Sequence, residues 1–304
     1  MMSNLAKSLE SECKAISGCD ALKRIIDPRG RDIGGFAVKR ILPSRGMKSV
    51  GPWLFFDHMG PADFAKDEGI DVRPHPHIGL ATVTYLFEGE LQHKDSLGTD
   101  VTVKPGDINL MVAGHGIVHS ERQSPAVKQQ PHRAHGLQLW LALPEADEQC
   151  DPSFHHYDKT ELPSADITGG NAKILMGEAY GKTSPVKTFS NTLYIEVNLA
   201  AGEIFALPKA QELAVYVVKG SLQVNKAELA EHHMGVFGDT TGVAITTLAN
   251  SHLVLVGGDA IGTRYMYWNF VASNKELIEA AKERWQQQAF PKIPGDAEDF
   301  LPLP

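Results

Sequence analysis

Tyr85-Leu86-Phe87-Glu88-Gly89-Glu90-Leu91-Gln92 in the first half of the chain is matched by Tyr216-Val217-Val218-Lys219-Gly220-Ser221-Leu222-Gln223 in the second half. Each octamer runs through an aromatic residue, two apolar residues, a charged residue, Gly, a polar residue, Leu and Gln. In each octamer the glycine stands at a turn that separates two apolar segments. A repeat of this kind indicates that one structural unit was duplicated. The sequence therefore predicts two copies of one β-barrel module.

The segments around both octamers have the composition of β-strands. They are short and apolar, many are rich in β-branched and aromatic residues, and Gly, Pro and Asp separate them, which is typical of strands. We expect an all-β fold of two tandem barrels or sandwiches. Its clearest strands are predicted at residues 53–56, 82–87, 101–103, 108–112, 136–144, 193–199, 213–218, 243–248 and 253–256.

The length of the chain also fits two units. A chain of 304 residues is expected to form about two domains of ordinary size. A polar, proline-containing stretch follows the apolar run that ends at Pro144, and we place the boundary there. The expected division is a lead-in at residues 1–20, an N-terminal lobe at 21–144, a linker at 145–163 and a C-terminal lobe at 164–304.

Two turns are predicted in the first half. Glu88-Gly89-Glu90 is expected to fold the strand at 81–87 back into a hairpin with the segment that begins at Leu91. Lys104-Pro105-Gly106-Asp107 predicts the second turn, because Pro fixes one backbone angle and Gly permits the left-handed angle that follows.

One helix is predicted near the end of the chain. Ser273-Asn274-Lys275-Glu276 has the spacing of a capping box. Apolar residues then recur on one helical face, and Pro291 and Pro294 close the segment. The expected role of this C-terminal helix is to cover an open side of a barrel.

A pair of histidines lies in Arg73-Pro74-His75-Pro76-His77. Residues at i and i+2 of an extended chain point to the same side, so both imidazoles can bind one metal ion. A histidine pair among prolines also fits a surface turn. The pair by itself leaves both interpretations open.

A second pair, His119 and Glu121, favours the metal site. It follows the strand at 108–112 and again has the i, i+2 spacing. Two antiparallel strands can therefore bring His75, His77, His119 and Glu121 together inside one barrel. We expect these four residues to be metal ligands, and Glu121 is also the candidate catalytic residue that takes a proton from the substrate.

The second half offers no equivalent ligand pair. Carrying the register of Tyr85 onto Tyr216 places Ala206 opposite His75 and Pro208 opposite His77. His93 is expected to be a hydrogen-bonded wall residue, with a position facing the cavity as the alternative. Exposed positions are expected for the histidines in loops or beside Gly and Pro: His58, His115, His132, His135, His155 and His156.

Three imidazoles and a carboxylate form a borderline ligand set. One divalent transition metal per chain is expected, with Fe(II), Mn, Ni, Co, Cu and Zn all compatible with these donors. Four protein ligands leave two positions open on a six-coordinate ion. A redox-active ion there favours oxygenase chemistry, whereas Zn would favour a structural or hydrolytic site.

Charge and composition exclude several classes of function. The net charge of −8 and the lack of a clustered basic face argue against direct binding of nucleic acid. No apolar run is long enough to span a membrane, and the N-terminus lacks the pattern of a secretory signal. Three cysteines in no paired pattern favour free thiols and a cytoplasmic protein.

The residues resemble those of the pirin family. The most specific matches are His75-Pro76-His77 and the segment Gly114-x-Gly116-Ile117-x-His119-x-Glu121. Weaker matches extend over nearly the whole chain: 36–43, 55–58, 105–107, 136–144, 212–220, 257–258 and 268–271. The chain departs from the usual His-Pro-His-Arg-Gly-Phe-Glu pattern, because Ile78 and Ala81 replace the arginine and the acidic residue.

The resemblance implies a bicupin fold, meaning two tandem cupin-type barrels, with a metal site in the N-terminal lobe and a degenerate C-terminal lobe. It implies iron as the usual metal and His75, His77, His119 and Glu121 as its ligands. It also implies two activities. Members of the family resemble quercetin 2,3-dioxygenases that cleave flavonols with O2, and eukaryotic members resemble iron-dependent transcriptional co-regulators.

Three functions are compatible with these residues and with the resemblance. The first is a metal-dependent dioxygenase that cleaves a flavonol of the quercetin type, or a similar enolic aromatic, with O2 as the second substrate. The second is a non-catalytic iron or redox sensor that regulates a protein partner. The third is a metal-binding protein of the same fold that acts on another small acid or a sugar.

Overall fold

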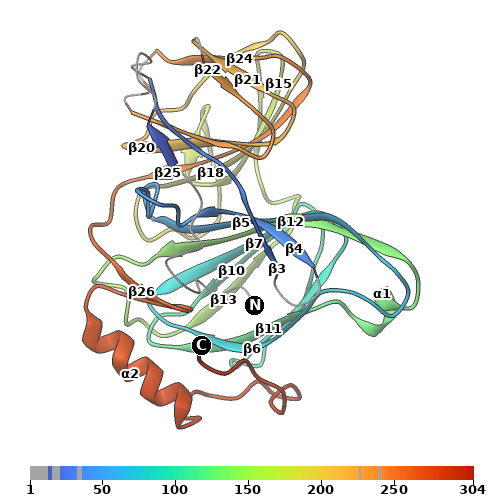
Figure 1. Cartoon of the computed structure of the whole chain (residues 1–304), viewed down its shortest axis with the longest axis vertical. Coiled ribbons are helices and arrows are strands. Elements are labelled where there is room, and N and C mark those ends of the chain that lie inside the picture. Colours follow the sequence, from blue (N-terminus) through green and yellow to red (C-terminus); the bar gives the residue numbers. More distant parts are fainter. Residues whose placement is uncertain (1–12, 16–20, 33–35, 226, 239, 241) are drawn as a thin grey trace.

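The computed structural model describes residues 13–15, 21–32, 36–225, 227–238, 240 and 242–304. The expected all-β fold is confirmed, because these residues form mostly strands. The described part contains two helices, α1 (Pro125–Lys128) and α2 (Lys275–Gln286). The strands build two lobes, one above the other in Figure 1, with the N-terminal lobe below.

A large and a small sheet form the N-terminal lobe. The large sheet has the strand order β13 (Ser153–Tyr157), β10 (Ile108–Val112), β7 (Leu80–Glu88), β12 (His132–Ala142), β5 (Trp53–Phe64), β4 (Ala37–Leu42), β3 (Arg29–Asp32). The small sheet has the order β6 (Asp71–His77), β11 (Ile117–Arg122), β8 (Leu91–Asp95), β9 (Asp100–Val103).

The C-terminal lobe repeats this construction. Its large sheet has the order β1 (Cys13–Ala15), β2 (Leu22–Ile26), β23 (Met234–Phe237), β20 (Glu212–Lys219), β25 (Ser251–Gly258), β18 (Thr192–Leu199), β15 (Gly170–Met176), β14 (Ser164–Ile167). Its small sheet has the order β19 (Ile204–Ala206), β24 (Ala244–Thr247), β21 (Leu222–Val224), β22 (Ala227–Leu229). Two short pairs complete the strands: β16 (Glu178–Ala179) with β17 (Lys182–Thr183), and β26 (Tyr265–Tyr267) with β27 (Phe270–Ala272).

The matching sheet orders confirm the duplication. The order β6-β11-β8-β9 in one lobe corresponds to β19-β24-β21-β22 in the other, and β10-β7-β12-β5 corresponds to β23-β20-β25-β18. The first octamer runs from β7 into β8, and the second runs from β20 into β21. The internal repeat in the sequence therefore marks equivalent positions of the two lobes.

The expected hairpin around Gly89 is wrong. β7 pairs with β10 and β12, whereas β8 pairs with β9 and β11, so the turn carries the chain from the large sheet to the small sheet. Gly89 has φ of 81°, and a Cβ there would lie 2.4 Å from the carbonyl oxygen of Arg133. The turn itself was predicted, but strand partners depend on distant segments that a local pattern does not report.

The two large sheets pack against each other and join the lobes. Their shared core contains aromatic pairs from opposite lobes, such as Trp53 with Tyr194 at 5.6 Å and Phe56 with Tyr216 at 4.7 Å between ring centroids. The Trp53 indole donates to the carbonyl oxygens of Leu193 and Gly257. Each small sheet then forms the outer side of its own lobe.

The structure differs from the expected division of the chain at two places. β2 lies in the stretch expected for the N-terminal lobe, but it pairs with β23 of the C-terminal lobe. β13 lies in the expected linker at 145–163, but it pairs with β10 of the N-terminal lobe. The lobe that such a strand joins is therefore decided by which sheet has an unpaired edge within its reach. Of the expected lead-in, residues 1–12 and 16–20 lie outside the described residues.

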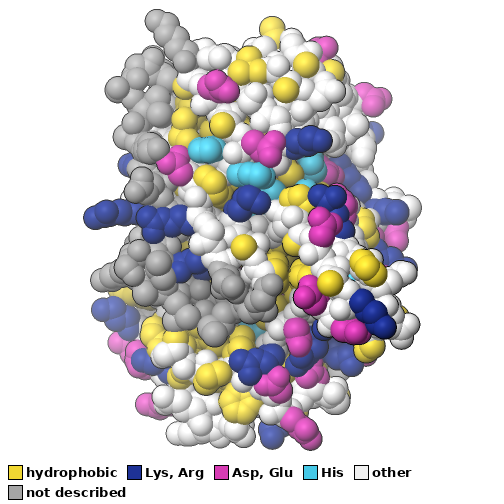
Figure 2. Space-filling model, turned by 45° about the vertical axis from the view of Figure 1, so that its right-hand side comes forward, with side chains coloured by type: hydrophobic (Ala, Val, Ile, Leu, Met, Phe, Trp, Pro, Cys, Tyr) yellow, Lys and Arg dark blue, Asp and Glu magenta, His cyan; other side chains and the backbone are white. Residues whose placement is uncertain are grey.

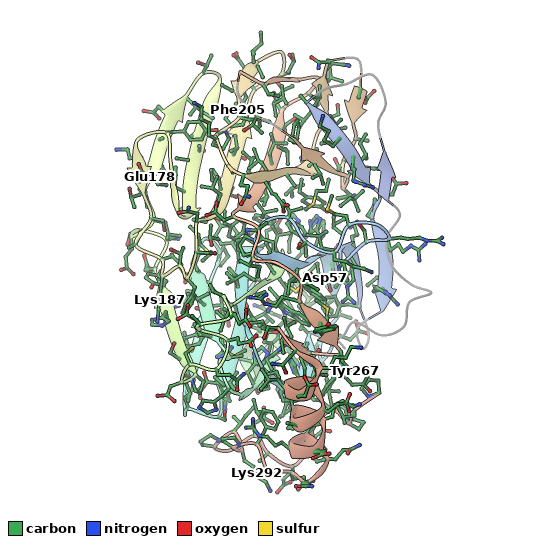
Figure 3. The ribbon with its side chains drawn as sticks, turned by 90° about the vertical axis from the view of Figure 1, so that its left-hand side faces the viewer. Asp57, Glu178, Lys187, Phe205, Tyr267 and Lys292 are labelled. Atoms are coloured by element: carbon green, nitrogen blue, oxygen red, sulfur yellow. The ribbon has the colours of Figure 1, made fainter. Side chains whose placement is uncertain are left out.

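The predicted C-terminal helix is present, and it covers the N-terminal lobe. α2 buries Ile278, Ala281 and Trp285 in a cluster with Val118 of β11 and Phe270 of β27. Its N-cap is Asn274, whose side chain accepts a hydrogen bond from the amide of Leu277, one residue after the expected cap at Ser273. Figure 3 shows Tyr267 beside this helix, and Lys292 lies beyond its end.

Two further expectations concern membranes and thiols. Within the described ranges, neither helix is long and apolar enough to cross a membrane. Cys150 is a free cysteine. Cys19 lies outside the described residues, as does the side chain of Cys13.

Candidate metal centre

The two ligand pairs lie on neighbouring strands of the small sheet. β6 and β11 are antiparallel, with His75 opposite His119 and His77 opposite Ile117. His75, His77, His119 and Glu121 are all buried, with at most 2% of any side chain exposed. The alternation of side chains along these strands directs the four residues toward the large sheet of the same lobe.

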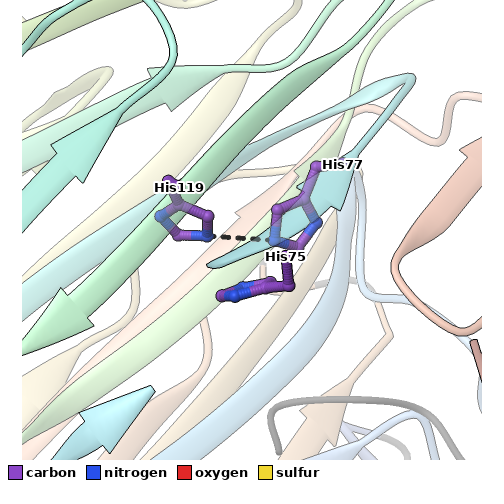
Figure 4. Close-up of side chains that lie close together, drawn as sticks. All are labelled: His75, His77 and His119. Atoms are coloured by element: carbon purple, nitrogen blue, oxygen red, sulfur yellow. Dashed lines mark hydrogen bonds between the residues drawn. The ribbon is translucent and has the colours of Figure 1, made fainter. Parts of the chain in front are cut away.

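The three histidines converge on one point. The Nε2 atoms of His77 and His119 are 3.1 Å apart (Figure 4), and the ring centroids of His75 and His119 are 4.3 Å apart. One nitrogen from each of the three rings lies within 4.8 Å of the others. This spacing matches what one metal ion needs, since zinc or a similar ion binds imidazole nitrogen at about 2.0–2.1 Å.

Backbone carbonyls hold two of the rings. His75 Nδ1 lies 2.8 Å from the carbonyl oxygen of Arg73, and His77 Nδ1 lies 3.1 Å from that of Asn269. A carbonyl only accepts, so Nδ1 carries the hydrogen and donates it, and Nε2 keeps its lone pair. Asn269 lies between β26 and β27, so a segment 192 residues away in the chain orients His77.

Glu121 lies on the other side of His119. Its Oε1 accepts a hydrogen bond of 3.1 Å from the Thr84 hydroxyl. Its Oε2 is buried and has no hydrogen-bond partner, and neither has Nδ1 of His119. Glu121 groups with His119 and His93 within 4.8 Å, so two trios of possible ligands share His119.

His93 is the residue of this site whose role the sequence left undecided. It is 3% exposed, lies directly opposite Glu121 in the β8–β11 pair, and its Nε2 is 3.1 Å from Asp95 Oδ2. Phe154 of β13 stacks on its ring at 4.5 Å. Leu91, His93 and Asp95 alternate with less buried residues, and this period of two was the pattern that could have placed His93 inside.

Burial controls the protonation of the cluster. Loss of solvation lowers the pKa of His75 to about 4 and lowers those of His77 and His119 well below the usual value. It raises the pKa of the Glu121 carboxyl. At neutral pH the three rings are therefore uncharged, and their lone pairs are available to a cation. The donors and the unpartnered carboxylate oxygen fit a divalent transition metal of the borderline class.

The C-terminal lobe has apolar side chains at the corresponding places. Ala206 is exposed, whereas Phe205 and Leu207 are buried inside the lobe, so the inward positions are shifted by one residue from the expected register. Among the described residues, groups of at least three His, Cys, Asp or Glu able to hold a metal occur in the N-terminal lobe.

The expected exposure of the six remaining histidines is confirmed for His115 and His156 and wrong for the other four. His58 was expected to be exposed, but it is fully buried because the C-terminal lobe packs over it and Tyr216 contacts its ring. His115 has 47% of its side chain exposed. His132, His135 and His155 are half-buried, and His156 is exposed.

Comparison with known proteins agrees with this architecture. The profile of the family described as Pirin matches residues 35–141, and the profile described as Pirin C-terminal cupin domain matches residues 194–291. A pirin-like protein of Caulobacter vibrioides is 43% identical over 285 residues, which cover 92% of this chain and 98% of the relative. The chain belongs to the pirin family. The resemblance inferred from the ligand segments is thereby confirmed.

Solved structures are similar to this pirin over both lobes. A quercetin 2,3-dioxygenase from Acinetobacter baumannii superposes with a TM-score of 0.84 at 33% identity, covering 92% of this chain and 94% of the other. A second quercetin 2,3-dioxygenase from the same organism gives 0.81 at 25% identity, with 94% and 99% covered. The bicupin fold expected from the sequence is thus confirmed.

Proposed function

We propose that this pirin binds one divalent transition metal through His75, His77, His119 and Glu121 and cleaves a flavonol of the quercetin type, or a similar enolic aromatic, with O2. The observation that carries the proposal is the convergence of three buried imidazoles beside a carboxylate whose Oε2 has no partner. The similarity to two proteins described as quercetin 2,3-dioxygenases supports the substrate class. We propose Fe(II) as the resident metal because the resemblance to the pirin family implies iron, which is redox-active and compatible with this donor set.

The metal, when bound, would supply the electron exchange with dioxygen that no side chain of this chain provides. The protein supplies position and proton transfer. Burial raises the pKa of Glu121, which favours its acting as an acceptor for the proton of a substrate hydroxyl. The Thr84 hydroxyl lies 3.1 Å from Glu121 Oε1 and 2.8 Å from Gln138 Oε1, and its single hydrogen can serve one of them at a time.

An aromatic wall of the large sheet faces this site. Trp140 of β12 stacks on Phe55 of β5 with ring centroids 4.0 Å apart, and its indole lies 5.0 Å from the His77 ring. Flat apolar rings beside a few polar groups are typical of pockets for aromatic ligands. This wall supports an aromatic substrate over a sugar.

Metal content and oxygen uptake test the proposal together. We expect about one iron in the N-terminal lobe of the purified chain and oxygen uptake with quercetin. His75→Ala with His119→Ala should abolish both, whereas His233→Ala in the C-terminal lobe should change neither. A double variant with unchanged metal content would overturn the ligand assignment. Iron-loaded protein that takes up no oxygen with any flavonol or related enol would overturn the dioxygenase.

Glu121→Gln separates binding from proton transfer. The amide keeps the size of the side chain and can bind a metal through its oxygen, but it does not accept a proton at neutral pH. We expect kcat for oxygen uptake to fall by about a hundredfold or more. The three histidines should still bind iron, but with lower affinity, so the variant is assayed at a higher protein concentration. Uptake at the wild-type rate would exclude Glu121 as the proton acceptor.

A second candidate function is an iron or redox sensor. It is favoured by the hydrogen bond from His77 to the Asn269 carbonyl, because this bond connects the centre to the outer segment that carries β26, β27 and α2. Hydrogen exchange of the amides in residues 265–286 should then differ between ferrous and ferric protein. Equal exchange in both states would exclude this path of communication.

A further inference from the structure

A second group of histidines lies where the two lobes meet. His58 of β5 and His135 of β12 come from the large sheet of the N-terminal lobe. Tyr216 of β20 and His232, which precedes β23, come from the C-terminal lobe. Figure 2 shows histidine side chains gathered at the level of this junction, on a face that is open to solvent.

Two of these rings face each other through Nε2. The Nε2 atoms of His58 and His135 are 2.7 Å apart, and the rings are nearly parallel at 28°. In the N-terminal metal centre, His77 and His119 face each other in the same way at 3.1 Å. Two neutral imidazoles in this arrangement share one hydrogen bond, or a cation takes both lone pairs.

Each of the two rings has a partner on its other nitrogen. His58 Nδ1 lies 2.7 Å from the Tyr216 hydroxyl, and His135 Nδ1 lies 3.8 Å from Glu88 Oε1. The contact of His135 is too long for a hydrogen bond, whereas the Tyr216 hydroxyl fixes the orientation of the His58 ring, as partners of metal-binding histidines regularly do. The two Nε2 atoms face each other, so a cation between them would replace the hydrogen bond that they share.

His232 is a third histidine beside His58, and it would complete the site after its side chain turns. Its ring centroid lies 5.2 Å from that of His58, and its Nε2 lies 3.5 Å from Glu231 Oε1. The side chain is 23% exposed, so it can turn toward His58 without disturbing a packed core. Its backbone has φ of 65°, a left-handed conformation that fixes where the ring projects.

We propose that His58, His135 and His232 form a second metal site, for a divalent cation of the zinc, nickel or copper class, at the junction of the two lobes. Three imidazoles with an open position suit these ions. The inference stands apart from the proposed function, because it uses none of the residues of the N-terminal centre. It assigns one more ion per chain than the ligand pairs of the sequence indicate.

The charges and protonation of the junction are consistent with a cation. Burial lowers the pKa of His58 to about 2 and that of His135 to about 4, so protons do not compete for the nitrogens at neutral pH. Two positive groups lie nearby: the Lys39 ammonium donates to the carbonyl oxygen of Gly60, and Arg133 Nε lies 3.6 Å from Glu88 Oε2. The carboxylates of Glu88 and Glu231 balance these two positive charges.

A metal at this place would connect the lobes. Two of its ligands come from the N-terminal lobe and one from the C-terminal lobe, and Tyr216 fixes His58 from the C-terminal side. An ion that binds only the folded chain stabilises it by mass action. Zinc is therefore expected to raise the melting temperature even when the N-terminal centre is disabled.

Equilibrium dialysis of tag-free, metal-free protein against zinc tests the proposal. In the chain carrying His75→Ala and His119→Ala, we expect one zinc ion with Kd of about 10 µM or tighter. Adding His135→Gln should remove it, since Gln keeps a hydrogen-bonding group at this position without an imidazole. His232→Asn should weaken binding about tenfold or more, because Asn tolerates the left-handed backbone. His155→Ala is the matched control and should leave the stoichiometry unchanged.

The wild-type background gives an independent reading should the double variant not fold. The wild-type chain should bind two zinc ions, and the His135→Gln variant should bind one. Zinc should also raise the melting temperature of this variant less than that of the wild type. Absence of zinc from the double variant, in a folded state by circular dichroism, would overturn the site. Zinc that survives both His135→Gln and His232→Asn would show an adventitious ion elsewhere and would overturn it equally.

Discussion

The interiors of the two lobes differ although their sheets correspond strand by strand. In the register set by Tyr85 and Tyr216, Thr84 of β7 corresponds to Val215 of β20, and His93 of β8 corresponds to Val224 of β21. Thr84 contacts Glu121 in the N-terminal lobe. Val215 and Val224 lie in an apolar core cluster of the C-terminal lobe.

This difference shows that the fold and a metal centre require different side chains inside the barrel. The C-terminal lobe shows that the barrel forms when its inside is filled with apolar side chains, each of which contributes about 1.5–3 kcal/mol on burial. The N-terminal lobe buries histidines and a carboxylate there, and buried polar groups cost stability unless they find partners. The candidate metal centre therefore lies in the lobe whose interior contains fewer apolar and more polar side chains.

The largest expected effect tests the apolar role of the C-terminal interior. Phe205 is 2% exposed, lies in the upper lobe in Figure 3 and packs beside Tyr180. Phe205→Ala should lower the free energy of unfolding by about 3–5 kcal/mol through lost burial and the cavity left behind. Urea denaturation measures the change, and the iron content of the N-terminal lobe should stay constant. Ile204→Ala, at the exposed neighbour, should change stability by less than about 0.5 kcal/mol.

A smaller effect is expected from giving the C-terminal lobe a polar group of the N-terminal lobe. Val215 has no exposed surface, so Val215→Thr would bury a hydroxyl in an apolar cluster. The free energy of unfolding should fall by about 1–3 kcal/mol. Chemical denaturation of the metal-free protein measures the loss. A neutral result would mean that the C-terminal interior accepts polar groups as readily as the N-terminal one.

The reverse change tests the support of Glu121. Thr84→Val keeps the shape of the side chain but removes the hydroxyl that donates to Glu121 Oε1. Because partners of ligating groups typically contribute tenfold or more to metal affinity, we expect iron binding to weaken by about tenfold. Competition with a chelator measures the affinity, with Thr102→Val on β9 as a control of the same chemistry. Unchanged affinity in Thr84→Val would argue that Glu121 needs no support from the large sheet.

The smallest effect concerns the junction, where the N-terminal sheet presents His58 and His135 to the other lobe. Burial lowers both pKa values, to about 2 and about 4, from the ordinary histidine value of 6.5. As the pH falls below about 6.5, the unfolded chain binds protons that the native chain does not, so stability falls. Between pH 6.5 and 4 the slope for His135 should approach about 1 kcal/mol per pH unit.

His135→Gln measures this contribution. The variant cannot take up the proton, so its free energy of unfolding should fall less steeply with decreasing pH than that of the wild type, with both proteins metal-free. Urea denaturation at a series of pH values from 4 to 7 records both slopes. Equal slopes would contradict the burial of a neutral His135 at the junction.

The sequence by itself determined the features that follow from local periodicity and repetition. The i, i+2 spacing put His75 with His77 and His119 with Glu121 on one face of each strand. His119 lies within 4.8 Å of His75 and His77 and, in a second trio with His93, of Glu121. Their role as ligands stays a prediction. The repeated octamer gave the duplication, and the apolar period of residues 277–285 gave the helix. These patterns are local because strand and helix geometry fix which side chains share a face.

Only the tertiary structure decided the features that depend on distant partners. The pairing of β2 with the C-terminal lobe and of β13 with the N-terminal lobe depends on which sheet edges are free to form hydrogen bonds. The same holds for the passage of the chain from the large sheet to the small sheet between β7 and β8. The burial of His58 depends on the other lobe, and the orientation of His77 depends on Asn269. The periodicity of the sequence predicts on which face of a strand or helix a residue lies. It does not predict which other segment packs on that face, because this depends on the packing of the whole chain.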